Sequence, residues 1–254
     1  MQLKLAPKAP HPATQPDGRG LKVSECFVSI QGEGKLTGTP SYFIRVSGCN
    51  LRCTWCDTPY ASWNPEGLVI SLDQLAERAR ASGVRHVVLT GGEPLLFPQA
   101  CELTPTLRAS GFHITVETAG TIAWPSKDLA CDLLSVSPKL ANSTPQSDPR
   151  DPTGAWAKKH EERRLNMEAL QRLLDEPWDR QLKFVVQSAN DLREVESVLA
   201  ELRGWRPEDV MLMPEGTTVP NSDAVRWILQ VCIEKGFRYC PRLHIHLFGN
   251  TRGT

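Results

Sequence analysis

The sequence has no excess charge of either sign, because 29 Lys and Arg residues balance 29 Asp and Glu residues along 254 positions. A neutral chain has no overall positive field to hold nucleic acid or an anionic membrane surface, although a local basic pocket is not excluded. The sequence also lacks any apolar run near the roughly 18 residues that a membrane-spanning helix requires. We therefore expect no nucleic-acid partner and no membrane partner.

No secretory signal is expected at the N-terminus, because residues 1–20 are rich in proline and polar residues and contain no hydrophobic stretch. We interpret them as a flexible leader that precedes a single α/β domain over residues 21–254. The absence of a signal favours a cytoplasmic protein. In that reducing compartment, the 8 cysteines are expected to serve metal binding or catalysis rather than disulfides.

Alternating strand-like and helix-like segments predict an α/β fold. Apolar runs without polar alternation are typical of strands buried on both faces of a parallel sheet. Six such runs occupy residues 43–47, 86–90, 113–118, 132–137, 183–187 and 209–213, and flanking strands are expected at residues 22–31 and 242–248. Apolar stripes predict helices over residues 72–79, 165–174, 192–202 and 225–232. Ser71 and Gln74 indicate a capping box before the first helix, and Gly236 a stop after the last.

Polar and glycine-rich segments collect at the carboxyl ends of the expected strands. They include residues 90–94 (TGGEP), 117–118 (ET) and 137–139 (SPK). Because chemistry in parallel α/β folds takes place beyond these ends, the pattern indicates an enzyme before any motif is considered. A proline-rich stretch over residues 142–159 is expected to be a long surface loop, of the kind that often serves as a functional lid.

Three cysteines, Cys49, Cys53 and Cys56, follow the strand at residues 43–47 with the spacing C-x3-C-x2-C. Three thiolates on one tight loop can bind three irons of a cubane cluster and leave the fourth iron open for a substrate or cofactor. A structural zinc site completed by a distant His or Cys is the alternative, although this spacing differs from the usual C-x2-C pairs.

The cysteine loop, with Trp55 before its last cysteine, resembles that of the radical S-adenosylmethionine superfamily. Residues 91–94 (GGEP) resemble the glycine-rich segment with which that superfamily contacts the S-adenosylmethionine amino group. Further segments, in the same order, resemble the 7-carboxy-7-deazaguanine synthase family: SIQGEG at 29–34, FIR at 43–45, CDT at 56–58, ETAG at 117–120 and SPK at 137–139. The resemblance implies a partial (βα)6-type radical S-adenosylmethionine barrel with extra flanking strands.

The resemblance also implies a carbon–nitrogen lyase that converts 6-carboxy-5,6,7,8-tetrahydropterin to 7-carboxy-7-deazaguanine, with loss of ammonia, in queuosine and 7-deazapurine biosynthesis. The implied cofactors are a 4Fe–4S cluster, S-adenosylmethionine and Mg²⁺. One electron would cleave S-adenosylmethionine to a 5′-deoxyadenosyl radical that abstracts hydrogen from substrate C6 and later returns it. The implied partners are an electron donor such as flavodoxin or ferredoxin and a second copy in a homodimer.

The motif residues take cofactor roles from the same resemblance. The cluster ligands would be Cys49, Cys53 and Cys56, and Thr58 would bind Mg²⁺. S-adenosylmethionine would be contacted by Trp55, Cys56, Asp57, Gly92, Ser137, Pro138 and Lys139. From the residues alone, Thr58 is interpreted as an ordinary loop hydroxyl, whereas Lys139 could equally be a solvated lysine.

The pterin site follows from the resemblance in the same way. Its residues would be Ile30, Gln31, Gly32, Arg45 and Thr90, and Glu117 is the candidate catalytic acid or base. The planar fork of Arg45 would pair with the substrate carboxylate, whereas the residues alone favour a salt bridge on the strand surface. Glu117 has the alternative role of a carboxylate that caps the next segment.

Two other interpretations of the chain stay open at this point. A glycyl-radical activating enzyme has the same cysteine spacing, and a zinc-stabilised interaction module would need no catalytic cluster. His244 and His246 lie two residues apart on the last expected strand, so they would share one face. Such a pair could bind a metal, but a structural role is favoured.

Overall fold

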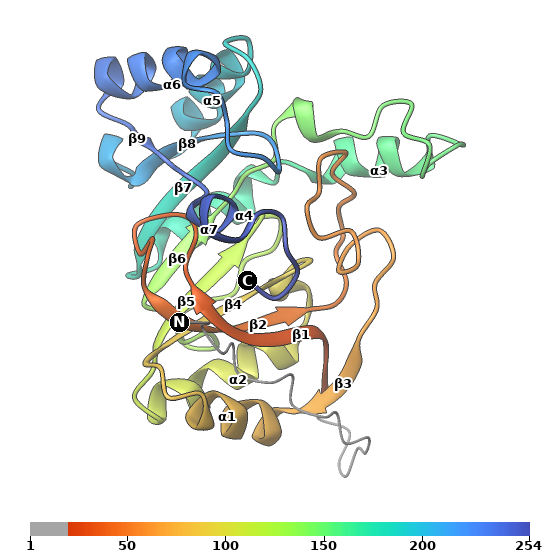
Figure 1. Cartoon of the computed structure of the whole chain (residues 1–254), viewed down its shortest axis with the longest axis vertical. Coiled ribbons are helices and arrows are strands. Elements are labelled where there is room, and N and C mark those ends of the chain that lie inside the picture. Colours follow the sequence, from red (N-terminus) through yellow and green to blue (C-terminus); the bar gives the residue numbers. More distant parts are fainter. Residues whose placement is uncertain (1–19) are drawn as a thin grey trace.

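The computed structural model describes residues 20–254. The leader expected over residues 1–20 therefore lies outside the described part, apart from Gly20, which begins the first strand. Within the described residues, no helix is long and apolar enough to cross a membrane. Figure 1 shows one curved sheet with helices packed along its outer face.

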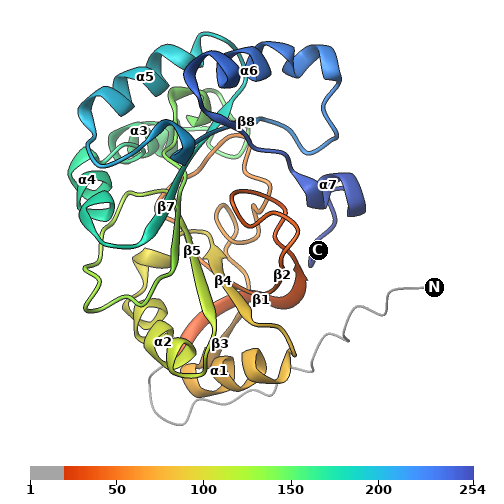
Figure 2. The same ribbon diagram turned by 90° about the vertical axis from the view of Figure 1, so that its left-hand side faces the viewer.

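The strands of the described chain form one sheet in the order β3-β1-β2-β4-β5-β6-β7-β8-β9. They are β1 (Gly20–Ile30), β2 (Pro40–Val46), β3 (Leu68–Ser71), β4 (His86–Gly91), β5 (His113–Thr118), β6 (Leu133–Val136), β7 (Asp179–Val186), β8 (Val210–Pro214) and β9 (Arg238–Tyr239). Neighbours from β2 to β9 are parallel, whereas β1 is antiparallel to β2 and β3. Because β3 and β9 stay at opposite edges, the sheet curves without closing (Figure 2). The partial barrel with flanking strands is confirmed.

The parallel strands are rich in apolar residues because both of their faces are largely buried. On β4, Val87 and Leu89 enter the core between the sheet and the helices. Val88 points to the opposite face and is also fully buried. Each such side chain stabilises the fold by about 1.5–3 kcal/mol relative to an exposed position. This double burial explains why the expected strands show no polar alternation.

Seven α-helices connect or follow these strands in the described residues. They are α1 (Leu72–Ala81), α2 (Pro98–Ala109), α3 (Ala155–Arg163), α4 (Met167–Asp175), α5 (Asp191–Glu201), α6 (Ser222–Lys235) and α7 (Leu243–Phe248). The predicted helices correspond to α1, α4, α5 and α6. The Ser71 side chain accepts a hydrogen bond from the Gln74 N–H at the start of α1. Gly236 ends α6 in the left-handed conformation, with φ 69°.

The prediction of a strand over residues 242–248 is wrong, because this segment folds as helix α7. Its alternating sequence resembles a half-buried strand, but helical spacing buries Ile245 and leaves 55% of Leu247 exposed. Residues two apart on a helix are separated by about 200°, so His244 and His246 do not share a face. They line different pockets, which rules out the two-histidine pair considered from the sequence.

Besides α7, two helices were not predicted, and one of them corrects the surface loop expected over residues 142–159. Helix α3 begins at Ala155, and its polar sequence buries only Ala157 and His160, too few positions for an apolar stripe. Helix α2 contains Pro105, a residue that removes one helical hydrogen bond and argues against a helix from sequence alone. Before α3, Asp148 and Asp151 are buried, so the stretch is not a freely solvated loop.

The loop between β1 and β2 turns inward and is anchored on the floor of the curved sheet. Lys35 Nζ lies 2.8 Å from Asp179 Oδ1 and 2.9 Å from Asp209 Oδ1. The backbone N–H of Lys35 donates to Gln181 Oε1 at 2.7 Å, and Gln181 in turn donates to the Ser135 hydroxyl. These contacts hold residues 31–39 inside the sheet, where they can contribute to a site.

Replacing Lys35 with Met is expected to lower the free energy of unfolding by about 2 kcal/mol. Removing the cation leaves the buried carboxylate of Asp209 with only the exposed Arg206 as a charge partner. Urea unfolding would measure the difference against Lys127→Met, a control at an exposed lysine. Equal stability of the two variants would contradict the anchoring role.

Candidate active site

A cavity of about 600 Å³ opens at the carboxyl ends of the parallel strands. Its wall is built from the segments that follow β1, β2, β4, β5 and β6, together with residues of β7, β8 and α7 and the C-terminal residues 250–254. Cavities of roughly 300–1,000 Å³ are typical of small-molecule and cofactor sites. The open sheet therefore supplies a site where parallel α/β folds usually have one.

The cavity brings together all but one of the site residues predicted from the sequence. Its wall includes Ile30, Gln31, Gly32, Arg45, Cys49, Cys53, Trp55, Cys56, Asp57, Thr58, Thr90, Gly92, Glu117, Ser137 and Lys139. Pro138 is the exception, since it does not line the cavity. The binding role of each residue stays a prediction.

The loop after β2 presents its three cysteines to the cavity. Cys53 is nearly buried, and Cys49 and Cys56 are half-buried. No three His, Cys, Asp or Glu side chains within residues 20–254 converge as ligands of one metal ion. A cubane cluster takes one thiolate on each of three irons, so its ligands do not need to meet at one point. Three thiols that line one cavity are a donor set that fits three irons of a 4Fe–4S cluster.

Burial determines the protonation of this loop before iron binds. It raises the pKa of the Cys49 thiol to about 12, and it also raises the pKa of Cys53. Metal ligation requires thiolates, so cluster assembly must release protons from these side chains.

The glycine segment after β4 packs directly on the backbone of the cysteine loop. The Gly92 N–H donates to the carbonyl of Val46 at 3.1 Å, and the Glu93 N–H donates to that of Gly48 at 2.9 Å. A Cβ at position 92 would overlap the Gly48 carbonyl group and lie 2.7 Å from the carbonyl oxygen of Ala61. This close approach requires glycine and places the two segments side by side on the cavity wall.

Glu93 links the glycine segment to the end of the next strand. Its fully buried carboxylate accepts hydrogen bonds from the N–H groups of Leu95 at 3.0 Å and Ala119 at 2.8 Å, and from the Thr118 hydroxyl at 2.8 Å. Burial raises the pKa of Glu93, although the three donors oppose this shift. The ends of β4 and β5 are therefore held together immediately behind the cavity wall.

Lys139 lies between the segment after β6 and the cysteine loop. Its Nζ donates to the carbonyl oxygen of Ser137 at 2.9 Å and to the hydroxyl at 2.8 Å, and it lies 5.7 Å from the centre of the Trp55 ring. Trp55 Nε1 donates to the carbonyl of Asn142 at 3.1 Å. Lys139 is thus half-buried at the cavity rather than fully solvated, and its charge suits a ligand that carries a carboxylate.

Arg45 on β2 is oriented by Glu25 on the neighbouring strand β1. Arg45 Nε donates to Glu25 Oε1 at 2.7 Å, and the Tyr60 hydroxyl donates to the same oxygen at 2.7 Å. The other carboxylate oxygen accepts from Arg252 Nε at 3.3 Å, and Arg252 stacks 3.9 Å from the centre of the Tyr60 ring. One carboxylate thus faces two guanidinium groups. The salt bridge expected from the residues alone is present. Arg252 also pairs with Glu66, so these two cations and two carboxylates balance in charge.

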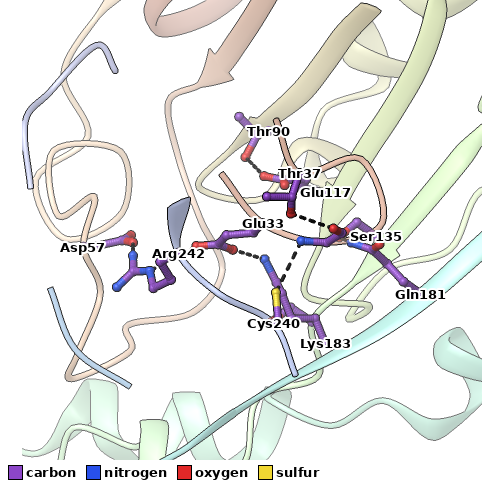
Figure 3. Close-up of polar contacts among 12 residues, drawn as sticks. Glu33, Thr37, Asp57, Thr90, Glu117, Ser135, Gln181, Lys183, Cys240 and Arg242 are labelled. Carbon is purple, nitrogen blue, oxygen red and sulfur yellow. Dashed lines mark hydrogen bonds and ion pairs between the residues drawn. The ribbon is translucent and has the colours of Figure 1, made fainter. Parts of the chain in front are cut away.

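Thr90 and Glu117 meet across the ends of β4 and β5. The Thr90 hydroxyl donates to Glu117 Oε2 at 2.7 Å (Figure 3). Both side chains line the cavity, so the carboxylate has a fixed position next to any ligand there.

Gly32 brings the loop after β1 into contact with α7. The Leu243 N–H donates to the Gly32 carbonyl at 2.8 Å, and a Cβ at position 32 would overlap the His244 imidazole. His244 lines the cavity, although the sequence analysis gave it no catalytic role. The same is true of residues 250–254, whose position on the wall has no sequence signature.

An ion-pair network around Glu33 was also missed from the sequence (Figure 3). Glu33 pairs with Lys183 and accepts from Arg242 Nε at 3.1 Å, and Arg242 also pairs with Asp57. Burial opposes the charge on Glu33, but the two cations outweigh it and lower the pKa of Glu33 to about 2. A lysine within the apolar run of β7 was the one available signal, since apolar strands rarely bury an unpaired cation.

Known proteins share both the sequence and the arrangement of these elements. The family described as the Radical SAM superfamily matches residues 43–186. A 7-carboxy-7-deazaguanine synthase from Rhodopirellula baltica is 49% identical over 237 residues, which cover 92% of this chain and 89% of that protein. A protein of the same name from Halobacterium salinarum is 49% identical and covers 94% of each chain. This chain belongs to the 7-carboxy-7-deazaguanine synthase family.

The radical SAM fold is also shared with solved structures. The crystal structure of QueE from Escherichia coli superposes with a TM-score of 0.66 and 26% identity, covering 89% of this chain and 95% of that chain. The crystal structure of Streptococcus suis SuiB bound to precursor peptide SuiA has 12% identity and a TM-score of 0.53, which shows likeness of fold alone. Membership of the radical SAM superfamily implies a 4Fe–4S cluster and S-adenosylmethionine, and the cysteine loop fits that cluster. The zinc-stabilised module is therefore not supported.

The contact between the two loops can be tested in this family member with Gly92→Ala. The added methyl group would press on the Gly48 and Ala61 carbonyl groups, so we expect a loss of about 1–3 kcal/mol in stability. We also expect weaker S-adenosylmethionine binding, measured by equilibrium dialysis of the anaerobically reconstituted protein. Gly83→Ala is the control. The backbone at Gly83 has φ 77°, and an added Cβ there would meet no atom within 4 Å, so this variant adds a methyl group without a steric overlap. Unchanged binding in Gly92→Ala would show that the close approach is unnecessary.

Proposed function

We propose that this protein converts 6-carboxy-5,6,7,8-tetrahydropterin to 7-carboxy-7-deazaguanine with release of ammonia, as a carbon–nitrogen lyase. The proposal is carried by one observation beyond family membership. A single cavity joins the three-cysteine loop to Arg45, whose guanidinium is oriented by Glu25. Radical chemistry and recognition of a carboxylate are the two requirements of this reaction.

The chain's own residues would bind and orient the cofactors. Cys49, Cys53 and Cys56 would hold the cluster, while Lys139 and Ser137 would receive the carboxylate end of S-adenosylmethionine. When bound, the cluster and S-adenosylmethionine would supply the one-electron chemistry that begins the reaction at substrate C6. The nearly buried position of Cys53 keeps water away from one side of this site.

Arg45 would select the carboxylated pterin. Its Nε is occupied by Glu25, and within the described residues its two terminal nitrogens have no protein acceptor. Those nitrogens can form a bidentate pair with a substrate carboxylate. Glu25 also accepts from the Tyr60 hydroxyl and from Arg252, so Arg45 does not bear its negative charge alone.

Glu117 would move a proton on the bound pterin. Its Oε2 is engaged by the Thr90 hydroxyl, which fixes the carboxylate and leaves the other oxygen for a substrate N–H. The negative charge of Glu117 contributes to raising the pKa of Lys183. The Lys183 ammonium therefore lies near the carboxylate whose charge would change when Glu117 gains or loses a proton. Loss of ammonia requires such proton transfers.

Several features of the proposal rest on the resemblance rather than on a contact. Thr58 would bind Mg²⁺; its hydroxyl lines the cavity 3.7 Å from the Cys56 sulfur. Mg²⁺ usually keeps waters and takes oxygens from substrate, so one protein hydroxyl would be sufficient with a substrate carboxylate. The flavodoxin or ferredoxin donor, the homodimer, the cytoplasmic location and the role in queuosine biosynthesis stay predictions.

The reaction can be tested directly under anaerobic conditions. Protein reconstituted with iron and sulfide would receive Mg²⁺, reductant, S-adenosylmethionine and 6-carboxytetrahydropterin, and mass spectrometry would follow 7-carboxy-7-deazaguanine. We expect many product turnovers for each S-adenosylmethionine consumed. A reducible cluster that cleaves S-adenosylmethionine without forming the deazaguanine would overturn the proposed reaction and favour another radical enzyme, such as a glycyl-radical activase.

Arg45→Gln is expected to raise the KM for the pterin by about 100-fold, because a charged hydrogen-bonded pair contributes roughly 2–3 kcal/mol. Arg45→Lys should recover only part of this loss, since an ammonium cannot reproduce the bidentate fork. The reductive cleavage of S-adenosylmethionine without pterin should be unchanged in both variants. Arg226→Gln, at an exposed arginine on α6, is the matched control. A KM unaltered by Arg45→Gln would exclude the carboxylate role.

A further inference from the structure

The segment between β6 and α4 is built against the cysteine loop instead of lying over the cavity as a lid. It runs from Leu140 through the 3-10 helix Ala141–Ser143 to the end of α3. Figure 1 shows it beside the loop that follows β2. We call residues 140–164 the bracing segment. The proposed function assigns it no role, apart from the contact of Asn142 with Trp55.

His160 is the centre of this contact. The side chain is fully buried, and its Nδ1 accepts a hydrogen bond from the backbone N–H of Arg52 at 3.1 Å. A neutral imidazole with an accepting Nδ1 carries its proton on Nε2, which lies 2.8 Å from the Ser143 hydroxyl. That hydroxyl in turn donates to the carbonyl of Leu140 at 2.6 Å. Burial and the nearby Arg164 lower the pKa of His160 to about 4, so the ring stays neutral.

The bracing segment binds the backbone on both sides of Cys53. The Arg52 N–H precedes this cysteine and is held by His160, while the Thr54 N–H follows it and donates to the Ser143 carbonyl at 2.8 Å. His160 and Ser143 are themselves hydrogen-bonded, so the two anchors form one unit. The N–H groups of Arg52 and Thr54, on either side of Cys53, cannot shift without breaking a hydrogen bond.

Side chains of the loop and the segment reinforce this attachment. The Arg52 guanidinium donates to the carbonyls of Cys49 at 2.8 Å and Leu51 at 2.7 Å, and it stacks 3.9 Å from the centre of the Trp156 ring of α3. Arg150 Nη2 donates to the Thr54 carbonyl at 2.7 Å. The loop is therefore fixed by contacts from the bracing segment at several backbone groups.

We propose that His160 is a positioning residue that holds the loop of Cys49, Cys53 and Cys56 in the shape that retains the cluster. The inference rests on the iron–sulfur cluster that the proposed function requires, but not on the identity of the substrate. It acts through the Arg52 peptide N–H, since His160 itself does not line the cavity. Partners one step removed from metal ligands commonly change metal affinity by about 10–100-fold when replaced.

Two variants of nearly equal shape separate this role from simple packing. His160→Asn keeps an oxygen at the position of Nδ1 that can accept from the Arg52 N–H, whereas His160→Leu keeps the branched shape without an acceptor. Both variants lose the hydrogen bond between Nε2 and the Ser143 hydroxyl, so both should lower the melting temperature of the metal-free protein. Only the Leu variant should also lose the contact to the cysteine loop.

The measurement is the rate at which iron leaves the anaerobically reconstituted full-length protein after a chelator is added, without pterin. We expect His160→Leu to lose iron about tenfold faster than the unchanged protein, and His160→Asn to stay within about threefold of it. His246→Leu, at an exposed histidine away from the cysteine loop, is the control and should lose iron at the unchanged rate. Equal rates for the Leu and Asn variants, fast or slow, would overturn the proposal.

Ser143→Ala keeps the proposal testable if His160→Leu does not fold. It removes only the hydroxyl that bonds Nε2 and leaves the carbonyl that binds Thr54. We expect this variant to lose iron about threefold faster than the unchanged protein. This effect is smaller than that of His160→Leu, which removes the direct partner of the Arg52 N–H. An unchanged rate would contradict the coupling of His160 to the loop. None of these iron-release measurements uses the pterin. They can therefore be interpreted even if the proposed reaction is wrong.

Discussion

The site depends on the close approach of two backbone segments, the glycine segment after β4 and the cysteine loop after β2. The Glu93 N–H donates to the Gly48 carbonyl, and there is no room for a side chain at Gly92 between the two segments. Because β2 and β4 are parallel neighbours, both loops leave the same edge of the sheet. A cluster bound by one loop would therefore lie next to the peptide groups of the other, where S-adenosylmethionine is expected.

Charge is arranged around the cavity in groups of paired ions rather than as an isolated cation. Glu25 is shared between Arg45 and Arg252, and Glu33 is shared between Lys183 and Arg242. Each carboxylate offsets the penalty of burying its cations, and a second carboxylate completes each group, since Arg252 also pairs with Glu66 and Arg242 with Asp57. A substrate carboxylate would pair with the terminal nitrogens of Arg45, which have no protein acceptor within residues 20–254. The same pairs fasten the C-terminal part of the chain to β1 and to the loop after it.

The bracing segment gives the cysteine loop a rigidity that three thiolates cannot provide themselves. Its proline-rich sequence is typical of a lid, but its polar groups are turned toward the loop, where His160 and Ser143 bind the N–H groups of Arg52 and Thr54. A neutral buried histidine suits this purpose, because it offers one acceptor and one donor in a fixed plane. The cavity is thus shaped by rigid contacts behind its wall as well as by the residues that line it.

The sequence by itself determined the fold class, the parallel strands and the motif residues, because these follow from local patterns. Continuous apolar runs predict strands that are buried on both faces. The cysteine spacing and the GGEP segment are short motifs that can be recognised without knowledge of any tertiary contact. Only the tertiary structure decided the pairing of Glu33 with Lys183 and Arg242, the place of Arg252, and the attachment of His160 to the cysteine loop. These partners are separated by about 100 residues or more in the sequence. No pattern in the sequence around one partner indicates which residue it will contact. The same limit explains α7, whose alternating residues predicted a strand until its packing buried Ile245 and turned Leu247 outward.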